Sequence, residues 1–311
     1  MAPAAAATTE VAATARHVGA IRTAVIVVHE RAPNARAARW RPLFQAVLGD
    51  GVTITECRVR SAEAARAAAR GAAAWNTDLV IAVGGDGTVN ACVNGIGDAP
   101  TRLAVVPAGT ANDLARVLGQ RPGAAAAAVD LQRGERRDID AIDVDGVRFY
   151  SAGGLGWVAD VADLANRLRA GSRLRRWAVG AIGSLLYTVA CVAVILFGRS
   201  LGARYRIRYR DAASGDERTR EVDAYGMLVA NCDRVGKAFF LAPVSRVDDG
   251  RYELIVFPRT TRLRLLRQVL AAQRGRMFDF PDMEWIQVTC AHIDCDRPQR
   301  FFGDGEILAV G

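Results

Sequence analysis

Four short apolar runs, each followed by a segment with helical spacing, fill the chain from residue 23 to residue 118. The runs are rich in β-branched residues, as buried parallel strands are. The strand–helix pairs are 23–29 with 34–48, 51–57 with 61–73, 78–83 with 87–95, and 102–107 with 111–118. Because strands that alternate with helices form a parallel sheet covered on both faces, we predict a three-layer α/β domain here.

The pattern shifts toward strands beyond about residue 140. Strand-like runs lie at 138–150, 203–210, 223–231, 251–257 and 284–290. They predict a second, mostly antiparallel β domain, and a chain of 311 residues is long enough for two domains with a core each. We therefore place the first domain at 21–137 and the second at 138–311, after a leader at 1–20.

Residues 1–20 lack a charged segment followed by a continuous apolar core, so we expect a disordered leader and not a secretory signal. A transit peptide is the alternative. The six cysteines are scattered, which together with the missing signal favours a reducing cytoplasm. The formal net charge of +8 favours acidic partners: an anionic membrane surface, a phosphorylated ligand or nucleic acid.

A loop with four glycines, "VGGDGTVNACVNG" (83–95), follows the third apolar run. Backbone N–H groups from Gly84 to Thr88 lead into a helix N-terminus, where they would form a cradle for a phosphate. Asp86 adds a carboxylate that would hold a phosphate-bound Mg²⁺ through water. The alternative is a tight strand-to-helix turn in which Asp86 caps the helix.

A second loop, "VPAGTANDLAR" (106–116), leaves the next strand in the same way. Its polar residues should reach the same edge of the sheet, since ligands of parallel α/β sheets bind beyond the carboxyl ends of the strands. Alone, this loop would be only a capped helix with Thr110 or Asn112 as the cap. Two such loops on one edge indicate a phosphate site.

Together the two loops resemble those of the diacylglycerol kinase catalytic family, which includes bacterial lipid kinases and sphingosine kinases. NAD kinases and phosphofructokinases share the GGDG loop, whereas the paired PxGTxND is typical of the lipid kinases. The resemblance continues at "APVSRVDDGRYELIVF" (242–257) and "FGDGEIL" (302–308), and so covers the chain from about residue 23 onward. It implies an ATP- and Mg²⁺-dependent lipid kinase with a nucleotide-binding first domain, an acceptor-binding second domain and the active site in the cleft between them.

The resemblance also implies roles for matching residues of the first domain. Asp86 and Asp113 would organise the Mg²⁺ and water network. The residues that would contact ATP are Thr55, Gly84, Gly85, Asp86, Gly87, Thr88, Asn90, Gly109, Thr110 and Asn112.

In the second domain, Glu306 would accept the proton of the lipid hydroxyl, with Asp304 as its partner. A hydroxyl is a weak nucleophile, so a carboxylate within hydrogen-bond reach assists phosphoryl transfer. Taken alone, "GDGE" is more typical of a β-turn, and the other motifs reverse that preference. The resemblance further implies a metal site at Asp249 with the backbone carbonyls of Arg246 and Arg251.

Some positions depart from the family pattern. The segment "VHERAPNARA" (28–37) replaces an Asn-Pro-x-Ser-Gly loop, Ala91 replaces a common glutamate, and Ser151 stands where Asn is frequent. Two alternatives to the lipid kinase therefore stay open: an NAD-kinase-like enzyme acting on a soluble nucleotide, and a pseudokinase that binds nucleotide or lipid without catalysis.

Two segments bear on the membrane. The apolar run 178–198 is long enough to span a bilayer, but one crossing would separate Asp86 and Asp113 from Glu306, so we expect burial or interfacial seating. The segment 262–276 is typical of a basic amphipathic helix, which would lie on a membrane or form a solvated face. We expect a cytoplasmic, peripherally membrane-associated protein without a nucleic-acid partner, because no recognised binding motif accompanies the charge. A homodimer stays open.

Overall fold

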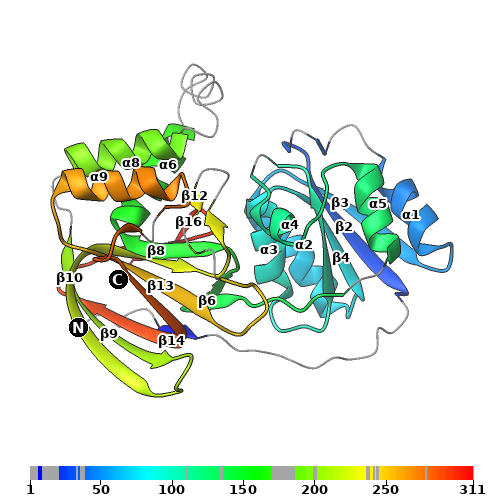
Figure 1. Ribbon diagram of the computed structural model, residues 1–311. Helices are drawn as coiled ribbons and strands as arrows, with labels where there is room; N and C mark the ends of the chain where they lie inside the picture. The colour runs from blue at the N-terminus through cyan, green and yellow to red at the C-terminus, as the bar shows by residue number, and fades with distance from the viewer. Residues whose placement is uncertain are drawn as a thin grey trace. The chain divides into compact units, whose positions relative to one another are not determined.

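The protein was analysed as a computed structural model, which describes residues 6–8, 21–32, 34–35, 39–109, 111–133, 136–169, 186–198, 202–235, 239–240, 242, 245–276 and 279–310. The chain divides into two compact units (Figure 1). One, here called the parallel-sheet unit, spans residues 12–138. The other, called the antiparallel-sheet unit, joins residues 1–11 to residues 139–311.

The parallel-sheet unit is built on a four-stranded sheet in the order β3-β2-β4-β5, with every pair parallel. This confirms the parallel sheet predicted from the apolar runs. The strands are β2 (Thr23–His29), β3 (Thr53–Val59), β4 (Leu79–Gly84) and β5 (Arg102–Pro107). The helices are α1 (Trp40–Leu48), α2 (Ala62–Ala74), α3 (Asp86–Ile96), α4 (Asp113–Val117) and α5 (Ala124–Arg133).

Helices cover both faces of this sheet, with α1 beside α5 on one face and α2 beside α3 on the other (Figure 1). All six residues of β4 are buried, as expected for a strand between two helical layers. The core under α1 and α5 includes Trp40 and Phe44, whose rings stack 6.0 Å apart. Because β4 and β5 pair in parallel, their carboxyl ends lie side by side, and each is followed by a polar loop.

The antiparallel-sheet unit contains a ten-stranded sheet in the order β16-β15-β8-β10-β13-β14-β1-β6-β7, with β9 pairing with both β10 and β14. Every strand pair within the described part of this unit is antiparallel, which confirms the predicted second domain. The strands are β1 (Ala6–Thr8), β6 (Ile142–Val144), β7 (Val147–Phe149), β8 (Ala152–Gly156), β9 (Ala203–Asp211), β10 (Glu217–Ala230), β13 (Tyr252–Pro258), β14 (Glu284–Cys295), β15 (Arg300–Gly303) and β16 (Glu306–Val310), beside a ribbon of β11 (Arg234–Val235) and β12 (Phe239–Phe240).

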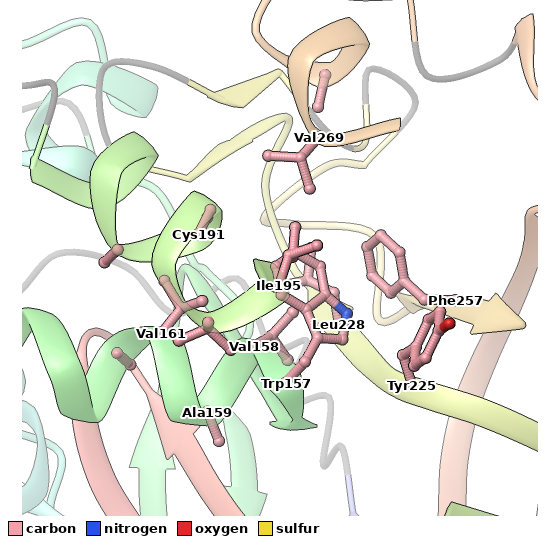
Figure 2. Packing of buried hydrophobic residues seen from close by; sticks show 14 of the residues in the cluster. Trp157, Val158, Ala159, Val161, Cys191, Ile195, Tyr225, Leu228, Phe257 and Val269 are labelled. Atoms are coloured by element: carbon pink, nitrogen blue, oxygen red, sulfur yellow. The ribbon is translucent and has the colours of Figure 1, made fainter. Parts of the chain in front are cut away.

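Three helices lie together on one face of the antiparallel sheet (Figure 1): α6 (Trp157–Arg169), α8 (Leu186–Phe197) and α9 (Arg262–Ala272). Their inner sides share one apolar core, in which Trp157 and Phe257 meet edge to face with ring centroids 5.2 Å apart (Figure 2). Ile195 from α8 and Val269 from α9 enter the same core. Burial of these apolar side chains is what holds the helices on the sheet.

The structure corrects the prediction that the first residues form only a disordered leader. Ala6–Thr8 forms β1, which pairs with β14 on one side and β6 on the other. Such pairing requires only backbone N–H and C=O groups, so an alanine-rich segment without an apolar pattern still completes the sheet. The rest of the predicted leader up to residue 20 lies outside the described residues.

The long apolar run ends in α8, and its first part, residues 178–185, lies outside the described residues. Helix α8 buries one side, including Ala190 and Ile195, and exposes Val189, Leu196 and Phe197. In the described part of the chain, no helix combines the length and the apolar character that crossing a membrane requires.

Candidate functional site

The first candidate loop connects β4 to α3. Gly85 is the N-cap of α3 with an extended backbone, and its carbonyl accepts the N–H groups of Thr88 and Val89 at 2.9 and 3.1 Å. The N–H groups of the first helical turn have no partner four residues back within their own helix, which is why a helix N-terminus binds anions. The segment Gly84–Thr88 therefore has the backbone arrangement that the predicted phosphate cradle requires.

The second candidate loop connects β5 to α4. Asn112 holds it closed, because its Oδ1 accepts the Gly109 N–H at 2.9 Å and its Nδ2 donates to the Gly109 carbonyl at 3.0 Å. Asn112 has a left-handed backbone (φ 54°) and stands at the N-cap of α4 without capping it. Its side chain is thus occupied in shaping the loop. Thr110, a predicted ATP contact, lies outside the described residues.

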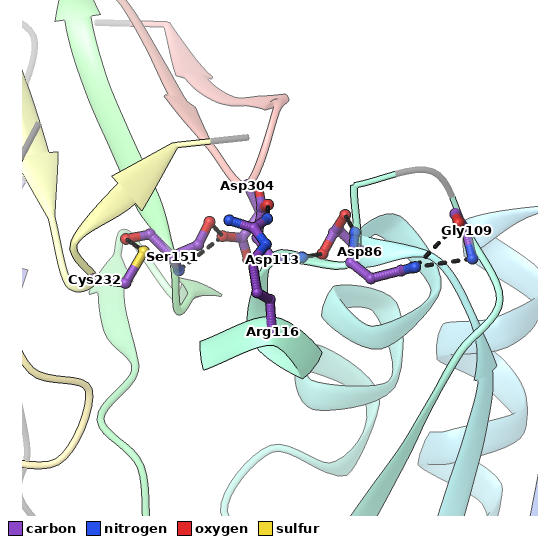
Figure 3. Close-up of polar contacts among 8 residues, drawn as sticks. Asp86, Gly109, Asp113, Arg116, Ser151, Cys232 and Asp304 are labelled. Carbon is purple, nitrogen blue, oxygen red and sulfur yellow. Dashed lines mark hydrogen bonds and ion pairs between the residues drawn. The ribbon is translucent and has the colours of Figure 1, made fainter. Parts of the chain in front are cut away.

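Asp86 joins the two loops (Figure 3). Its Oδ2 accepts the Asn112 N–H at 2.8 Å and its Oδ1 accepts the Asp113 N–H at 2.6 Å. The carboxylate therefore caps α4, while the N-cap position of α3 is taken by Gly85 and not by Asp86, the cap considered from the sequence. Burial raises the pKa of Asp86, the neighbouring Asp113 raises it further, and the backbone donors oppose both effects.

The Asp86 and Asp113 carboxylates fit a magnesium ion in chemical type, since Mg²⁺ prefers oxygen ligands and retains several waters. Each carboxylate oxygen can accept more than one hydrogen bond or ligand contact, so the backbone bonds to Asp86 leave it capacity toward a hydrated cation. Asp113 also forms an ion pair with Arg116. These two residues are the ones that would hold the ion.

The glycines of the two loops meet backbone to backbone. A Cβ added to Gly85 would lie 3.2 Å from the Cα of Gly109, and one added to Gly84 would overlap the side chain of Thr88. Around Gly87, by contrast, no heavy atom lies within 4 Å of an added Cβ. Packing alone thus requires small residues at several of these positions, while Gly87 leaves open space at the start of α3.

Two of the predicted ATP contacts, Thr55 on β3 and Asn90 on α3, lie outside the loops that join strand to helix. Thr55 is an exposed residue of β3 that aligns, through Val25, with Val80 near the start of β4, so the structure does not bring it to the loops that follow Gly84. Asn90 lies on α3, where its carbonyl and Oδ1 both accept from the Asn94 side chain at 3.0 Å. Both assignments stay predictions.

The D-G-E segment forms the turn between β15 and β16. Asp304 and Gly305 both have positive φ (49° and 85°), as a two-residue type I′ hairpin requires. The Asp304 carboxylate accepts the N–H groups of Ser151 and Tyr150 at 2.9 and 3.2 Å and the Ser151 hydroxyl at 2.5 Å (Figure 3). Asp304 is therefore engaged in fixing the turn, and the β-turn considered from the sequence is present.

Glu306 begins β16 directly after this turn, and its side chain is exposed. Two helices approach the turn: Asn166 of α6 donates its Nδ2–H to the Gly305 carbonyl at 2.7 Å, and the Tyr187 hydroxyl of α8 would lie 3.6 Å from a Cβ at Gly305. A carboxylate at the end of a turn fixed by both neighbours is suited to accept a proton from a bound hydroxyl.

Sequence reasoning missed two of the residues near this turn: Asn166, which binds it, and Tyr187, which approaches it. Both lie in helices with no motif around them, so no local signal was available. Ser151 was noted only as a departure from the family pattern, yet its hydroxyl and N–H both bind Asp304.

The predicted metal residues lie on the loop before β13. Asp249 is exposed and accepts the Arg251 N–H at 3.2 Å, while the Arg246 side chain pairs with Asp248. Over the residues that the structure describes, no group of three or more His, Cys, Asp or Glu side chains is arranged to hold a metal ion. The assignment of Asp249 with two backbone carbonyls stays a prediction.

Comparison with known proteins gives matches along most of the chain. Residues 23–144 match the diacylglycerol kinase catalytic domain, and residues 154–311 match the YegS C-terminal NAD kinase beta sandwich-like domain. A diacylglycerol kinase of Bacillus subtilis (strain 168) is 28% identical over 243 residues, covering 77% of this chain and 74% of that protein. A probable lipid kinase YegS-like of Chromohalobacter salexigens is 28% identical over 225 residues, covering 68% of this chain and 66% of that protein.

A solved structure has the same fold. The crystal structure of a putative diacylglycerol kinase from Bacillus anthracis str. Sterne superposes with a TM-score of 0.71 at 20% identity, covering 94% of this chain and 92% of that one. At this identity the likeness is one of architecture, and it agrees with the parallel and antiparallel sheets described above.

Proposed function

Because the chain belongs to the diacylglycerol kinase catalytic family, we propose that it transfers the γ-phosphoryl group of ATP to a hydroxyl of diacylglycerol or a related membrane lipid. The product is then phosphatidic acid or an analogue. One observation supports the proposal above the others: Asp304 is bound into the turn by Ser151 and Tyr150, whereas the neighbouring Glu306 remains exposed. The D-G-E turn thus presents one carboxylate for chemistry.

In the proposed reaction, the lipid hydroxyl oxygen forms a bond to the γ-phosphorus while the bond from that phosphorus to the β,γ-bridging oxygen of ATP breaks. Glu306 accepts the hydroxyl proton and later releases it to water, and ADP carries away the bonding electrons of the broken bond. Asn166 and Asp304 keep the turn in place during this transfer, which matters because small displacements of a catalytic group are costly.

The first turn of α3 binds the phosphates of ATP in this proposal, through backbone N–H groups beside Gly85 and Gly87. Asp86 and Asp113 would hold the Mg²⁺ and its waters, and the ion would neutralise charge on the phosphate oxygens. Asp86 also ties the β4–α3 loop to the β5–α4 loop, so the proposed nucleotide site and the local fold depend on the same carboxylate.

The test is transfer of labelled γ-phosphate from ATP to a panel of lipids in mixed micelles: diacylglycerol, ceramide, sphingosine and phosphatidylglycerol, with NAD as a soluble acceptor. Glu306→Gln keeps the size of the side chain and removes the base. Glu217→Gln is the matched control, because Glu217 is an exposed glutamate at the start of β10 paired only with Arg210 in the described ion pairs.

We expect label in one lipid, a loss of at least about a hundredfold in Glu306→Gln, and unchanged transfer in Glu217→Gln. Label in NAD alone would replace the proposal with an NAD-kinase-like enzyme. No transfer by a protein that still binds ATP would identify a pseudokinase, and full activity of Glu306→Gln would remove Glu306 as the base.

A further inference from the structure

We propose that the outer sides of α8 and α9 form a docking surface for a bilayer that contains anionic phospholipids. This surface, here called the α8–α9 face, consists of Val189, Leu196, Phe197, Leu263, Arg267, Leu270 and Arg274. The inference deepens the proposed function by stating how a lipid substrate is reached, but binding to a bilayer is measured without any phosphoryl transfer.

Helix α9 has leucines on the side where a solvated helix has polar residues. Its inner side, including Leu265, Val269 and Ala272, is buried. On the opposite side Leu263 and Leu270 are 59% and 38% exposed, at the i and i+7 positions of one ridge. The hydrophobic residues of this helix therefore exceed what its core contact requires.

Helix α8 contributes a second apolar ridge. It contains no charged residue, buries its inner side, and leaves Val189, Leu196 and Phe197 exposed by 49%, 46% and 79%. Surface apolar residues scattered singly are ordinary, but contiguous ones mark a binding surface. The exposed residues of α8 and α9 are contiguous only if the two helices lie side by side with both ridges facing outward.

Hydrogen bonds at both ends of the two helices establish that arrangement. Gln273, just after α9, donates a hydrogen bond to Thr188 near the start of α8, and the Arg262 guanidinium donates to the carbonyls of Leu196 and Gly198 at 2.6 and 2.7 Å at the other end. The helices are therefore adjacent and antiparallel (Figure 1). Since both bury their inner sides in one core (Figure 2), both ridges point away from the same core.

The charge of the α8–α9 face selects the kind of bilayer. Neither helix contains an acidic residue. Arg267 lies between the two leucines on α9 and Arg274 lies in the turn two residues after its end; both are exposed without an ion pair to the described part of the chain. Arginines beside inserted apolar side chains bind the phosphates of anionic headgroups.

A second copy of the chain is the competing occupant. In a symmetric pair, the same face of two copies meets, so the arginines of both copies, Arg267 and Arg274, would be gathered in one interface with no acidic residue in either helix to compensate them. An anionic bilayer provides the missing complement, which is why we assign the face to lipid.

The α8–α9 face is connected to the proposed catalytic turn. Tyr187, in the first turn of α8, approaches Gly305, and the exposed residues of α8 begin two positions later at Val189. The helix that would lie on the bilayer thus starts at the turn that carries Glu306. A lipid hydroxyl at the level of the headgroups would then lie at the end of the antiparallel-sheet unit that carries Glu306.

The experiment is co-sedimentation of the full chain, without ATP, with phosphatidylcholine vesicles that contain or lack phosphatidylglycerol. Three variants are compared with wild type: Leu263→Gln with Leu270→Gln, Arg267→Gln with Arg274→Gln, and Trp75→Gln. Trp75 is the matched control, because its side chain is 87% exposed and lies at the end of α2 in the other unit. Thermal unfolding of each variant verifies the fold.

We expect wild type and Trp75→Gln to bind anionic vesicles equally, and the leucine variant to bind at least about tenfold more weakly, since two partly exposed leucines lose their transfer into the bilayer. The arginine variant should lose the preference for phosphatidylglycerol and the dependence on salt. Equal binding by all proteins, or no binding by wild type, would overturn the proposal. A concentration-dependent dimer that the leucine variant lacks would instead assign the face to a second copy.

Failure of this inference is distinguishable from failure of the proposed function. Transfer to a short-chain diacylglycerol that dissolves as monomers should be equal in wild type and the leucine variant. Wild type that binds vesicles without transferring phosphate to any lipid would overturn the function alone, and transfer without vesicle binding would overturn the docking surface alone.

Discussion

Gly109 lies so close to Gly85 that a Cβ added to Gly109 would stand 2.4 Å from the Gly85 Cα. The same two loops are joined by the Asp86 carboxylate and by the Ala108 N–H, which donates to the Gly84 carbonyl at 2.9 Å. The β4–α3 and β5–α4 loops are therefore fixed to each other, so that a change in either loop displaces the other.

Gly109→Ala should destabilise the parallel-sheet unit by about 1–3 kcal/mol, because the methyl group meets backbone that cannot rotate away, and it should weaken ATP binding by displacing the cradle. Urea unfolding and nucleotide titration measure the two effects. Gly71→Ala in α2 is the control, because no atom lies within 4 Å of its added Cβ, and it should be neutral or gain about 0.5–1 kcal/mol. Equal unfolding free energies for the two variants would contradict the predicted contact.

Asp86→Asn should also destabilise the loops, by about 1–3 kcal/mol. Asparagine has one acceptor oxygen, so it can satisfy the N–H of Asn112 or of Asp113 but not both, and its own amide group faces the other donor. The free energy of unfolding from urea titration checks this. Asp98→Asn after the end of α3 is a suitable control at an exposed site, and a loss there as large as at Asp86 would contradict a specific role in joining the loops.

Glu253 should make the stability of the protein depend on pH. Its side chain is 3% exposed, accepts from Ser245 and, at 3.2 Å, from Gln287, and burial raises its pKa from 4.5 to about 7. The folded state then holds this proton more tightly than the unfolded state. Its contribution to stability is complete below pH 4.5 and is lost as the pH rises to about 7.

Wild type should therefore lose about 3 kcal/mol relative to Glu253→Gln across that interval. Glutamine keeps an acceptor for Gln287 and can donate to Ser245, so the variant should fold and lack this titration. Urea midpoints at a series of pH values measure the difference. The Glu217 side chain is 81% exposed, so the urea midpoint of Glu217→Gln should change with pH as that of wild type does. If the urea midpoint of Glu253→Gln also changed with pH as wild type does, Glu253 would not titrate in this range.

Asn166→Ala should lower kcat by about tenfold to a hundredfold with little change in KM, because the Gly305 carbonyl loses its donor and Glu306 is held less well. Arg167→Ala is the neighbouring control, since that side chain is 67% exposed and pairs with Asp163 on the same helix. A variant that loses stability while kcat stays constant would assign Asn166 a structural role only.

The strands of the parallel sheet were predictable because their signal is local. The expected runs 23–29 and 102–107 coincide with β2 and β5, and the other two strands begin within two residues of the expected start. Burial on both faces demands continuous apolar, β-branched residues, and such a run is visible without knowledge of its partners.

The run 138–150, in the antiparallel-sheet unit, is less simple than the single strand expected from the sequence. It contains β6 and β7 joined by a turn at Asp145 and Gly146, whose positive φ values are those that an Asp-Gly pair adopts in a hairpin turn.

The contacts that shape the candidate site were not predictable. Asp86 binds backbone 26 and 27 positions away, and Asp304 binds Ser151 at a separation of 153. A sequence motif identifies the carboxylates, but it does not indicate which of them are used to hold loops and which remains exposed. The resemblance named Glu306 as the proton acceptor and Asp304 as its partner, but only the folded chain shows that Asp304 holds the turn through Ser151 and Tyr150.

The pairing of β1 has a consequence for the order in which the two sheets form. Ala6 aligns with His292, 286 positions further along the chain. Residues 12–138, which lie between β1 and the rest of its unit, pair within their own sheet across much shorter separations. Contacts of large sequence separation form slowly. The parallel sheet should therefore be complete before β1 takes its place beside β14.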